Sequence, residues 1–227
     1  MNLPTDGSID DFVTKVAEIM FSGPVANPWQ NERQRHNLSE AIKRFRSAPL
    51  ILVGEAPGWR GAGQTGVPLT SEDVAMERGW QWLAIEDPGH PVVEQTAKNI
   101  WQILSELQIC AALCWNVFAL HPHNQGHLHS NRRPTRSEIE DEKNLSLLSG
   151  YLEMFAGRRV IAIGRIAEHT LKRFCQTGRI NLALESVRHP SFGGISRCRE
   201  QLRSKWTALK NSQLTCGERR AISRTGH

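Results

Sequence analysis

The chain has 227 residues, of which 39% are hydrophobic, and a formal net charge of +5 at pH 7. This length suits one domain with a continuous core, which we place at residues 1–210, and no segment resembles a linker between two domains. No run of about 18 apolar residues is present, and Asp6, Asp10 and Asp11 stand where a secretory signal would be basic, so we expect a soluble, cytoplasmic protein without a membrane partner.

The first half of the chain alternates helical and strand-like patterns. Apolar residues at helical spacing predict helices over residues 9–21 and 31–46. Residues 50–53 form a short apolar run between Pro49 and Gly54, which predicts a strand buried on both faces. An amphipathic helix over residues 94–107 then leads into a second buried strand over residues 111–118.

The second half continues the alternation after a polar loop. Thr135 and Glu138 have the spacing of a capping box, which predicts a helix over residues 136–155. The elements expected after it are a strand over residues 159–163, a helix over 166–174, a strand over 182–187 and a helix over 196–209. Strands that alternate with helices favour a parallel sheet, so we predict a three-layer α/β/α sandwich with a four-stranded parallel sheet.

Positive charge is concentrated at the end of the chain. Residues 197–227 contain eight Lys or Arg and two Glu, so the rest of the chain is close to neutral. Both phosphate binding and a solvated tail fit this distribution. We expect residues 211–227 to be a basic, disordered tail.

The five cysteines are odd in number and include no Cys-x-x-Cys pair. This pattern argues against a disulfide framework and against a closely spaced metal knuckle, so we expect reduced thiols.

Polar residues follow the predicted strands at the ends where open α/β sheets gather their ligands. Glu55 follows the first strand inside a loop that contains Gly54 and Gly58, and Asn116 lies in the second. His189 follows the fourth strand. Their shared position predicts one site at the carboxyl edge of the sheet.

Three segments resemble motifs of the uracil-DNA glycosylase superfamily, particularly its iron-sulfur branch. The first motif corresponds to LVGEAPG at residues 52–58, followed by TGVP at 65–68. The second corresponds to WNV at residues 115–117 with NRRPT at 131–135, and the third to HPS at 189–191. The resemblance implies a DNA glycosylase that hydrolyses the N-glycosidic bond of uracil or a related deaminated base and leaves an abasic site.

Asn116 is implied to read the extruded base, with Ala56 and Leu69 beside it. The amide oxygen can accept from uracil N3–H while the amide nitrogen donates to O4, whereas cytosine reverses both polarities. An unmatched buried pair costs on the order of 1 to 3 kcal/mol per group, which is enough for discrimination. A strand-end amide that caps a turn is the alternative role for Asn116.

Glu55 and His189 are the implied catalytic residues. A neutral His189 can donate a hydrogen bond to the oxyanion that develops at uracil O2. Glu55 can position or deprotonate the attacking water, or face the cationic sugar with a fixed negative charge, and the sequence leaves these two roles open. No lysine lies in the motifs, so we expect a monofunctional enzyme without strand cleavage.

The expected partner is DNA, single- or double-stranded, bound by a monomer associated with the nucleoid. The backbone at Gly58 and Gly193 and a set of side chains are expected to hold phosphates: Arg132, Arg133, Ser191 and Arg197. Phe192 and Ile195 are the candidates for an apolar wedge.

The chain departs from the family pattern at two places. No cysteine precedes Cys110, so we expect neither the four-cysteine cluster of the iron-sulfur branch nor any other cofactor. Leu69 stands where the family places a phenylalanine that stacks on the base, a contact worth roughly 1 to 3 kcal/mol. Either Trp59 replaces that ring or uracil binding is weaker.

Two rival interpretations remain. A protein of this fold that binds nucleic acid or bases without excision is compatible with the missing phenylalanine. A metal-dependent hydrolase is compatible with the alternating histidines of the polar loop, which could hold zinc: His121, His123, His127 and His129. We predict no metal site, because no carboxylate or cysteine accompanies them.

Overall fold

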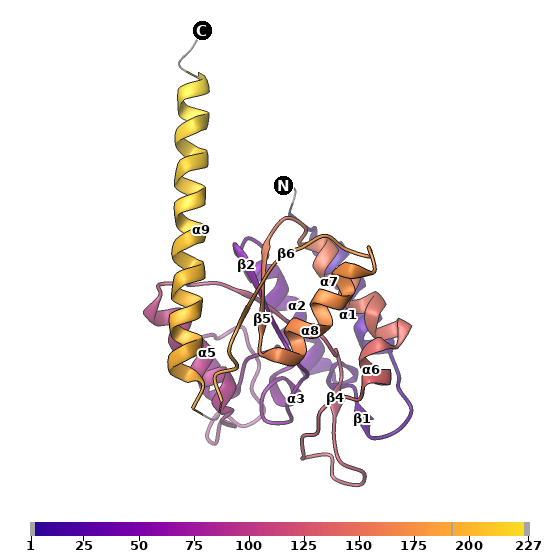
Figure 1. The fold of residues 1–227 in the computed structure, drawn as a ribbon. Coiled ribbons are helices and arrows are strands. Elements are labelled where there is room, and N and C mark those ends of the chain that lie inside the picture. The colour runs from indigo at the N-terminus through magenta and orange to yellow at the C-terminus, as the bar shows by residue number, and fades with distance from the viewer. Residues whose placement is uncertain (1–2, 192, 225–227) are drawn as a thin grey trace.

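The computed structural model describes residues 3–191 and 193–224, with side chains described as far as residue 211 (Figure 1). The elements in chain order are α1 (Asp6–Glu18), β1 (Val25–Ala26), the 3-10 helix η1 (Pro28–Gln30), α2 (Glu32–Phe45), β2 (Leu50–Gly54), α3 (Ala62–Thr65), α4 (Glu72–Glu77), α5 (Gln95–Glu106), β3 (Leu113–Asn116), β4 (His121–Pro122), α6 (Arg136–Glu140), α7 (Glu142–Met154), β5 (Arg159–Ile163), α8 (Arg165–Gln176), β6 (Ala183–Val187) and α9 (Ile195–Arg224).

Four of the strands form one parallel sheet in the order β3-β2-β5-β6, which confirms the predicted four-stranded parallel sheet. The chain moves outward from β2 to β3 and then returns to β5 on the other side of β2. The strand order therefore reverses between β2 and β5. Sheets of this kind bind ligands at the carboxyl ends of the strands beside such a reversal.

Helices cover both faces of the sheet, and β2 shows why. Ile51 and Val53 belong to a core cluster shared with α1, α2, α7 and α8, whereas Leu50 and Leu52 belong to a cluster shared with α5 and α9. Successive side chains of a strand point to opposite faces, so an unbroken apolar strand needs a helical layer on each. Figure 1 shows α7 and α8 on one side of the sheet and α5 and α9 on the other, which confirms the three-layer fold.

The predicted helix over residues 136–155 is in fact two helices. The capping box of Thr135 and Glu138 opens α6 as predicted, but Asp141 adopts an extended conformation and ends it. The Asp141 side chain accepts from the backbone N–H of Lys143 and caps α7. A residue that satisfies the first amides of a new helix is a local break that apolar periodicity does not report.

The last helix is longer than the predicted helix over residues 196–209. Helix α9 continues from Ile195 to Arg224 and projects from the body of the molecule (Figure 1). The segment contains no proline, and one glycine, Gly217, costs only about 1 kcal/mol in a helix. No helix in the described part of the chain is long and apolar enough to cross a membrane.

Candidate active site

The motif residues meet at the carboxyl edge of three adjacent strands. Gly54 at the end of β2 pairs in register with Asn116 at the end of β3. On the other side of β2, Gly164 follows β5 directly, and a Cβ on Gly164 would lie 3.1 Å from the Cβ of His189. Neighbouring strands are about 4.8 Å apart, so about 10 Å separates the backbones of Asn116 and Gly164. Asn116 and His189 therefore lie at the same edge of the sheet, on either side of β2.

Asn116 is buried, with 3% of its surface exposed. Its Oδ1 atom lies 2.6 Å from the point that a Cβ on Gly54 would occupy, so the amide lies over the glycine. Within the described residues, no group donates to or accepts from this side-chain amide. The amide atoms still reach solvent, since they are not among the described side-chain atoms that are both fully buried and without a hydrogen-bond partner. The amide is therefore open to a ligand or to water.

The surroundings of His189 define which ring nitrogen carries the proton. The backbone N–H of Ser191 donates to His189 Nδ1 at 3.3 Å, and the Ser191 hydroxyl lies 2.7 Å from the same nitrogen. A backbone N–H can only donate, so Nδ1 accepts and the proton of the neutral ring is on Nε2. Burial lowers the pKa of His189, although the nearby Glu94 carboxylate opposes this shift. Both features favour a neutral imidazole with an Nε2–H donor.

The loop that carries His189 is held by contacts that the motifs did not reveal. Asn99 of α5 donates from Nδ2 to the carbonyl of Pro190 at 2.9 Å. A Cβ on Gly194 would lie 2.1 Å from the carbonyl oxygen of His189, so only glycine fits beneath this turn. Asn99 has no sequence signal, because its partner is distant in the chain and local periodicity does not report such a contact.

Glu55 is half-buried in the loop after β2. Burial raises the pKa of its carboxyl group, and the positive charge of Arg133 partly opposes the shift. No hydrogen bond to the carboxylate is found in the described part of the chain. Ala56, the next residue, packs against the core cluster on the side of α1 and α2. Glu55 thus offers a free acceptor beside the reversal of strand order.

Leu69 lies next to Asn116 in an unusual backbone conformation. Its φ angle is +55°, in the left-handed region that leucine rarely adopts. Trp101 holds this conformation by donating from Nε1 to the Leu69 carbonyl at 3.0 Å. Leu69 Cδ2 lies 3.1 Å from the Cβ position of Gly54, so the side chain lies over the same glycine as the Asn116 amide.

The contacts of Trp59 differ from those expected if its ring replaced the phenylalanine that the family stacks on the base. Its ring stacks on His129 at a centroid distance of 5.2 Å, and the Arg60 guanidinium lies 4.8 Å from the ring centroid. Its backbone N–H donates to Asn131 Oδ1 at 2.9 Å, and a Cβ on the preceding Gly58 would lie 3.7 Å from that side chain. Trp59 therefore joins the loop after β2 to the loop before α6.

The two arginines of the 131–135 segment differ in their contacts, and the prediction for Arg132 needs correction. All five N–H donors of Arg132 bind protein acceptors, namely both oxygens of Glu138 and the carbonyls of Pro24, His123 and Arg133. None is left for a DNA phosphate, so Arg132 braces the loop. Arg133 is exposed, and no ion pair involves it among the described residues.

The segment after His189 contains the other predicted DNA contacts. Ser191 directs its hydroxyl to His189, while Gly193 is exposed with a φ angle of +72°. Arg197 is exposed at the start of α9, and no partner for it lies in the described part of the chain. Of the two wedge candidates, Phe192 lies outside the described residues and Ile195 packs against the core on the side of α5.

The described contacts of the histidines in the polar loop are with other protein groups. His121 is buried, and its Nδ1 and Nε2 lie 2.8 and 3.0 Å from the carbonyl oxygens of Pro57 and Leu128. No group of three or more His, Cys, Asp or Glu in the described residues could hold a metal ion. No such group includes any of the described cysteines.

Comparisons with known proteins identify the family and the fold of the chain. The sequence profile of the "Uracil DNA glycosylase superfamily" matches residues 42–215. The fold is similar to the crystal structure of wild-type SMUG2 from Pedobacter heparinus, with a TM-score of 0.70 and 14% sequence identity over 91% of this chain and 98% of that one. No curated protein sequence matches the chain.

Proposed function

Because the chain belongs to the uracil DNA glycosylase superfamily, we propose that it is a monofunctional DNA glycosylase acting on uracil or a related deaminated base. It hydrolyses the N-glycosidic bond and leaves an abasic site. One observation carries the proposal: the unpartnered amide of Asn116 and the neutral ring of His189 lie at the same edge of the sheet, on either side of β2. A planar base with polar edges suits the space between them.

Asn116 supports recognition of uracil by hydrogen-bond polarity. An extruded base presents its Watson–Crick edge to the pocket, where uracil offers a donor at N3 and an acceptor at O4. The amide of Asn116 supplies the complementary acceptor and donor. Gly54 leaves the room that this amide needs, and Leu69 borders the same space with an aliphatic side chain.

His189 and Glu55 support the bond cleavage. When the bond between C1′ and the base breaks, its electron pair moves onto the base and reaches O2, where the Nε2–H of His189 donates a hydrogen bond. The oxygen of water bonds to the cationic C1′, and its proton passes to Glu55 or to solvent. Glu55 also stabilises the sugar cation by its charge while it is ionised.

Exposed cations beside the site support DNA as the partner. Arg133 and Arg197 have no described ion-pair partner and suit phosphate contacts. The backbone at Gly58 lies in the loop that Trp59 joins to the loop of Arg133, and Gly193 lies just before α9, which carries Arg197. Ser191 contributes by orienting His189. We also propose a monomer that acts in the cytoplasm on nucleoid DNA.

A second candidate function is binding of a base or nucleic acid without excision. Leu69 favours it, since an aliphatic side chain next to Asn116 offers no ring to stack on the extruded base, and Trp59 stacks on His129 instead. The two functions differ in product, not in binding.

An excision assay tests the proposal and separates it from the alternative. Labelled oligonucleotides with uracil, hypoxanthine or xanthine, single- or double-stranded, are incubated with the protein and then heated in alkali, which breaks the strand at abasic sites. We expect breaks with at least one lesion and none without alkali. His189→Ala and Glu55→Gln should abolish or strongly reduce them. Lesion-specific binding without any break would support the alternative.

A further inference from the structure

A groove of about 670 Å³ lies between α8 and the α6–α7 pair, outside the candidate active site. Its apolar residues come from all three helices: Ile139, Leu145, Ile166 and Phe174. Its arginines surround them: Arg136, Arg165, Arg173 and Arg179. None of these residues has a part in the proposed excision reaction.

The groove carries an excess of positive charge. Glu140 is the one carboxylate among the described lining residues, and both Arg136 and Arg173 pair with it at 3.0 and 2.6 Å. Arg179 pairs with Glu142 at 2.7 Å. Arg165 is exposed, and no hydrogen bond or ion pair to it is found in the described part of the chain. Two carboxylates thus face four guanidinium groups, which leaves capacity for anionic ligand groups.

The apolar residues discriminate between two classes of anionic partner. Single-stranded nucleic acid binds on several exposed aromatic rings that stack with successive bases, whereas the one phenyl ring among the described lining residues, Phe174, is 3% exposed and only the imidazole of His169 is exposed. Partly exposed aliphatic side chains such as Ile166 and Leu145 suit the apolar face of a peptide. Carboxylates on the same peptide can then form paired hydrogen bonds with the arginine guanidinium groups.

We propose that this groove binds an acidic amphipathic segment of a partner protein. The segment lies along α8 as a helix of similar length, 12 residues, with Leu, Ile or Phe against the groove and Asp or Glu toward the arginines. Helix α8 begins directly after Gly164, which contacts His189, so the partner would be held beside the catalytic edge.

Selection from a displayed library of random 12-residue peptides, the length of α8, tests this proposal without assuming a sequence. We expect the enriched peptides to combine acidic residues with apolar residues at helical spacing. Arg173→Glu should weaken binding of such a peptide at least about tenfold, which corresponds to loss of a charged hydrogen-bond pair. Fluorescence anisotropy of the labelled peptide measures this change, and circular dichroism checks the fold.

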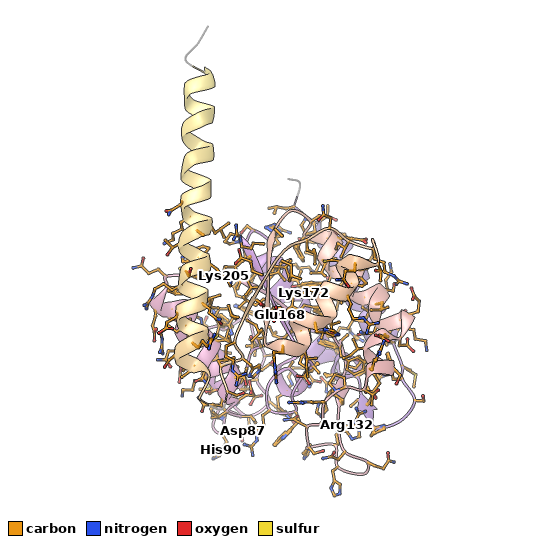
Figure 2. All side chains as sticks on the ribbon, in the orientation of Figure 1. Asp87, His90, Arg132, Glu168, Lys172 and Lys205 are labelled. Atoms are coloured by element: carbon orange, nitrogen blue, oxygen red, sulfur yellow. The ribbon has the colours of Figure 1, made fainter. Side chains whose placement is uncertain are left out.

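The adjacent Lys172 supplies the matched control. Lys172 lies on the same helix but is not one of the residues that line the groove, and it pairs with Glu168 at 2.6 Å (Figure 2). Lys172→Glu makes the same charge change and should leave peptide binding unaltered. If Arg173→Glu does not fold, Arg165→Ala replaces it, because the Arg165 side chain is exposed.

Three results would overturn the proposal: enriched peptides without acidic residues or no enrichment, equal binding by Arg173→Glu and the wild type, or displacement of the peptide from the groove by a single-stranded oligonucleotide. Excision activity is measured separately, so the two proposals fail independently.

Discussion

The amide oxygen of Asn116 lies 2.6 Å from the point that a Cβ atom on Gly54 would occupy. The two residues are register partners at the ends of β3 and β2. A real Cβ does not approach an oxygen so closely, so the position of the amide depends on the glycine. This pair links the turn after β2 to the base recognition that we propose for Asn116, although neither motif alone reveals the dependence.

Gly54→Ala should therefore displace the Asn116 amide or the Leu69 side chain. We expect a single-turnover excision rate lower by about 10²-fold, because a misplaced polar group loses its alignment with the base. Gly150→Ala in α7 is the matched control, since its Cβ would lie 3.8 Å from Phe12 in ordinary contact. The control should keep the wild-type rate. A wild-type rate in Gly54→Ala would contradict the inferred dependence.

Asn116→Asp should change base preference more than DNA affinity. An ionised aspartate offers only acceptors, so its second oxygen faces the acceptor O4 of uracil, and excision of uracil should fall by about 10- to 100-fold. Relative rates on different lesions and binding of abasic DNA measure the two effects. Asn144→Asp is a contrasting variant, because Asn144 bonds only backbone groups such as Val117 and Ala119. If the Asn116→Asp variant keeps the base preference of the wild type, Asn116 does not take part in base recognition.

The pH dependence of excision should respond to Arg133. In the proposed mechanism the active form has an ionised Glu55 and a neutral His189, so we expect the rate to rise with pH as both groups lose protons. Burial raises the pKa of Glu55 and Arg133 lowers it, so Arg133→Gln should raise this pKa further and move the acid limb to higher pH. Arg136→Gln, whose guanidinium pairs with Glu140, is the control. Superimposable profiles for Arg133→Gln and the wild type would exclude Glu55 as the group that titrates.

Arg132 and Arg133 should differ in what their removal changes. Arg132→Ala leaves Glu138 and three carbonyls without their donor, and we expect a loss of about 1 to 3 kcal/mol in the free energy of unfolding. Arg133→Ala should leave stability unchanged, weaken DNA binding and reduce the salt slope of log K by about 0.7 to 0.9. Chemical denaturation and salt-dependent anisotropy measure both. The reverse pattern would assign the phosphate contact to Arg132.

Local patterns in the sequence predict much of the fold. Strands β2, β3 and β5 are recognisable because each is a short, mainly apolar run that is almost wholly buried, and β5 has the predicted bounds, residues 159–163. The edge strand β6 is mostly only partly buried and contains Glu185 and Ser186, so its signal is the alternation with the helices around it. Thr135 and Glu138 cap α6 as expected, because a capping box is a contact between residues close in sequence. The alternation of helix and strand was sufficient to predict a parallel sheet.

The parts that the sequence did not predict depend on contacts between distant residues. Arg132 binds the carbonyl of Pro24, Asn99 binds that of Pro190, and β1 pairs with β4 through only two residues of each strand. The charge of Arg132 alone predicts phosphate binding, and only the folded structure shows that protein acceptors already occupy its donors. Charge and periodicity describe a residue and its neighbours in the chain, whereas these roles arise only when the chain has folded.

The most direct test of the convergence of Glu55, Asn116 and His189 is a crystal structure of the Glu55→Gln variant bound to DNA that contains 2′-fluoro-2′-deoxyuridine, which resists hydrolysis. The extruded uracil should lie between β3 and β5, with the Asn116 amide hydrogen-bonded to N3 and O4 and His189 Nε2 hydrogen-bonded to O2. A uracil that remains stacked in the DNA, or that binds without contact to Asn116 and His189, would contradict the account.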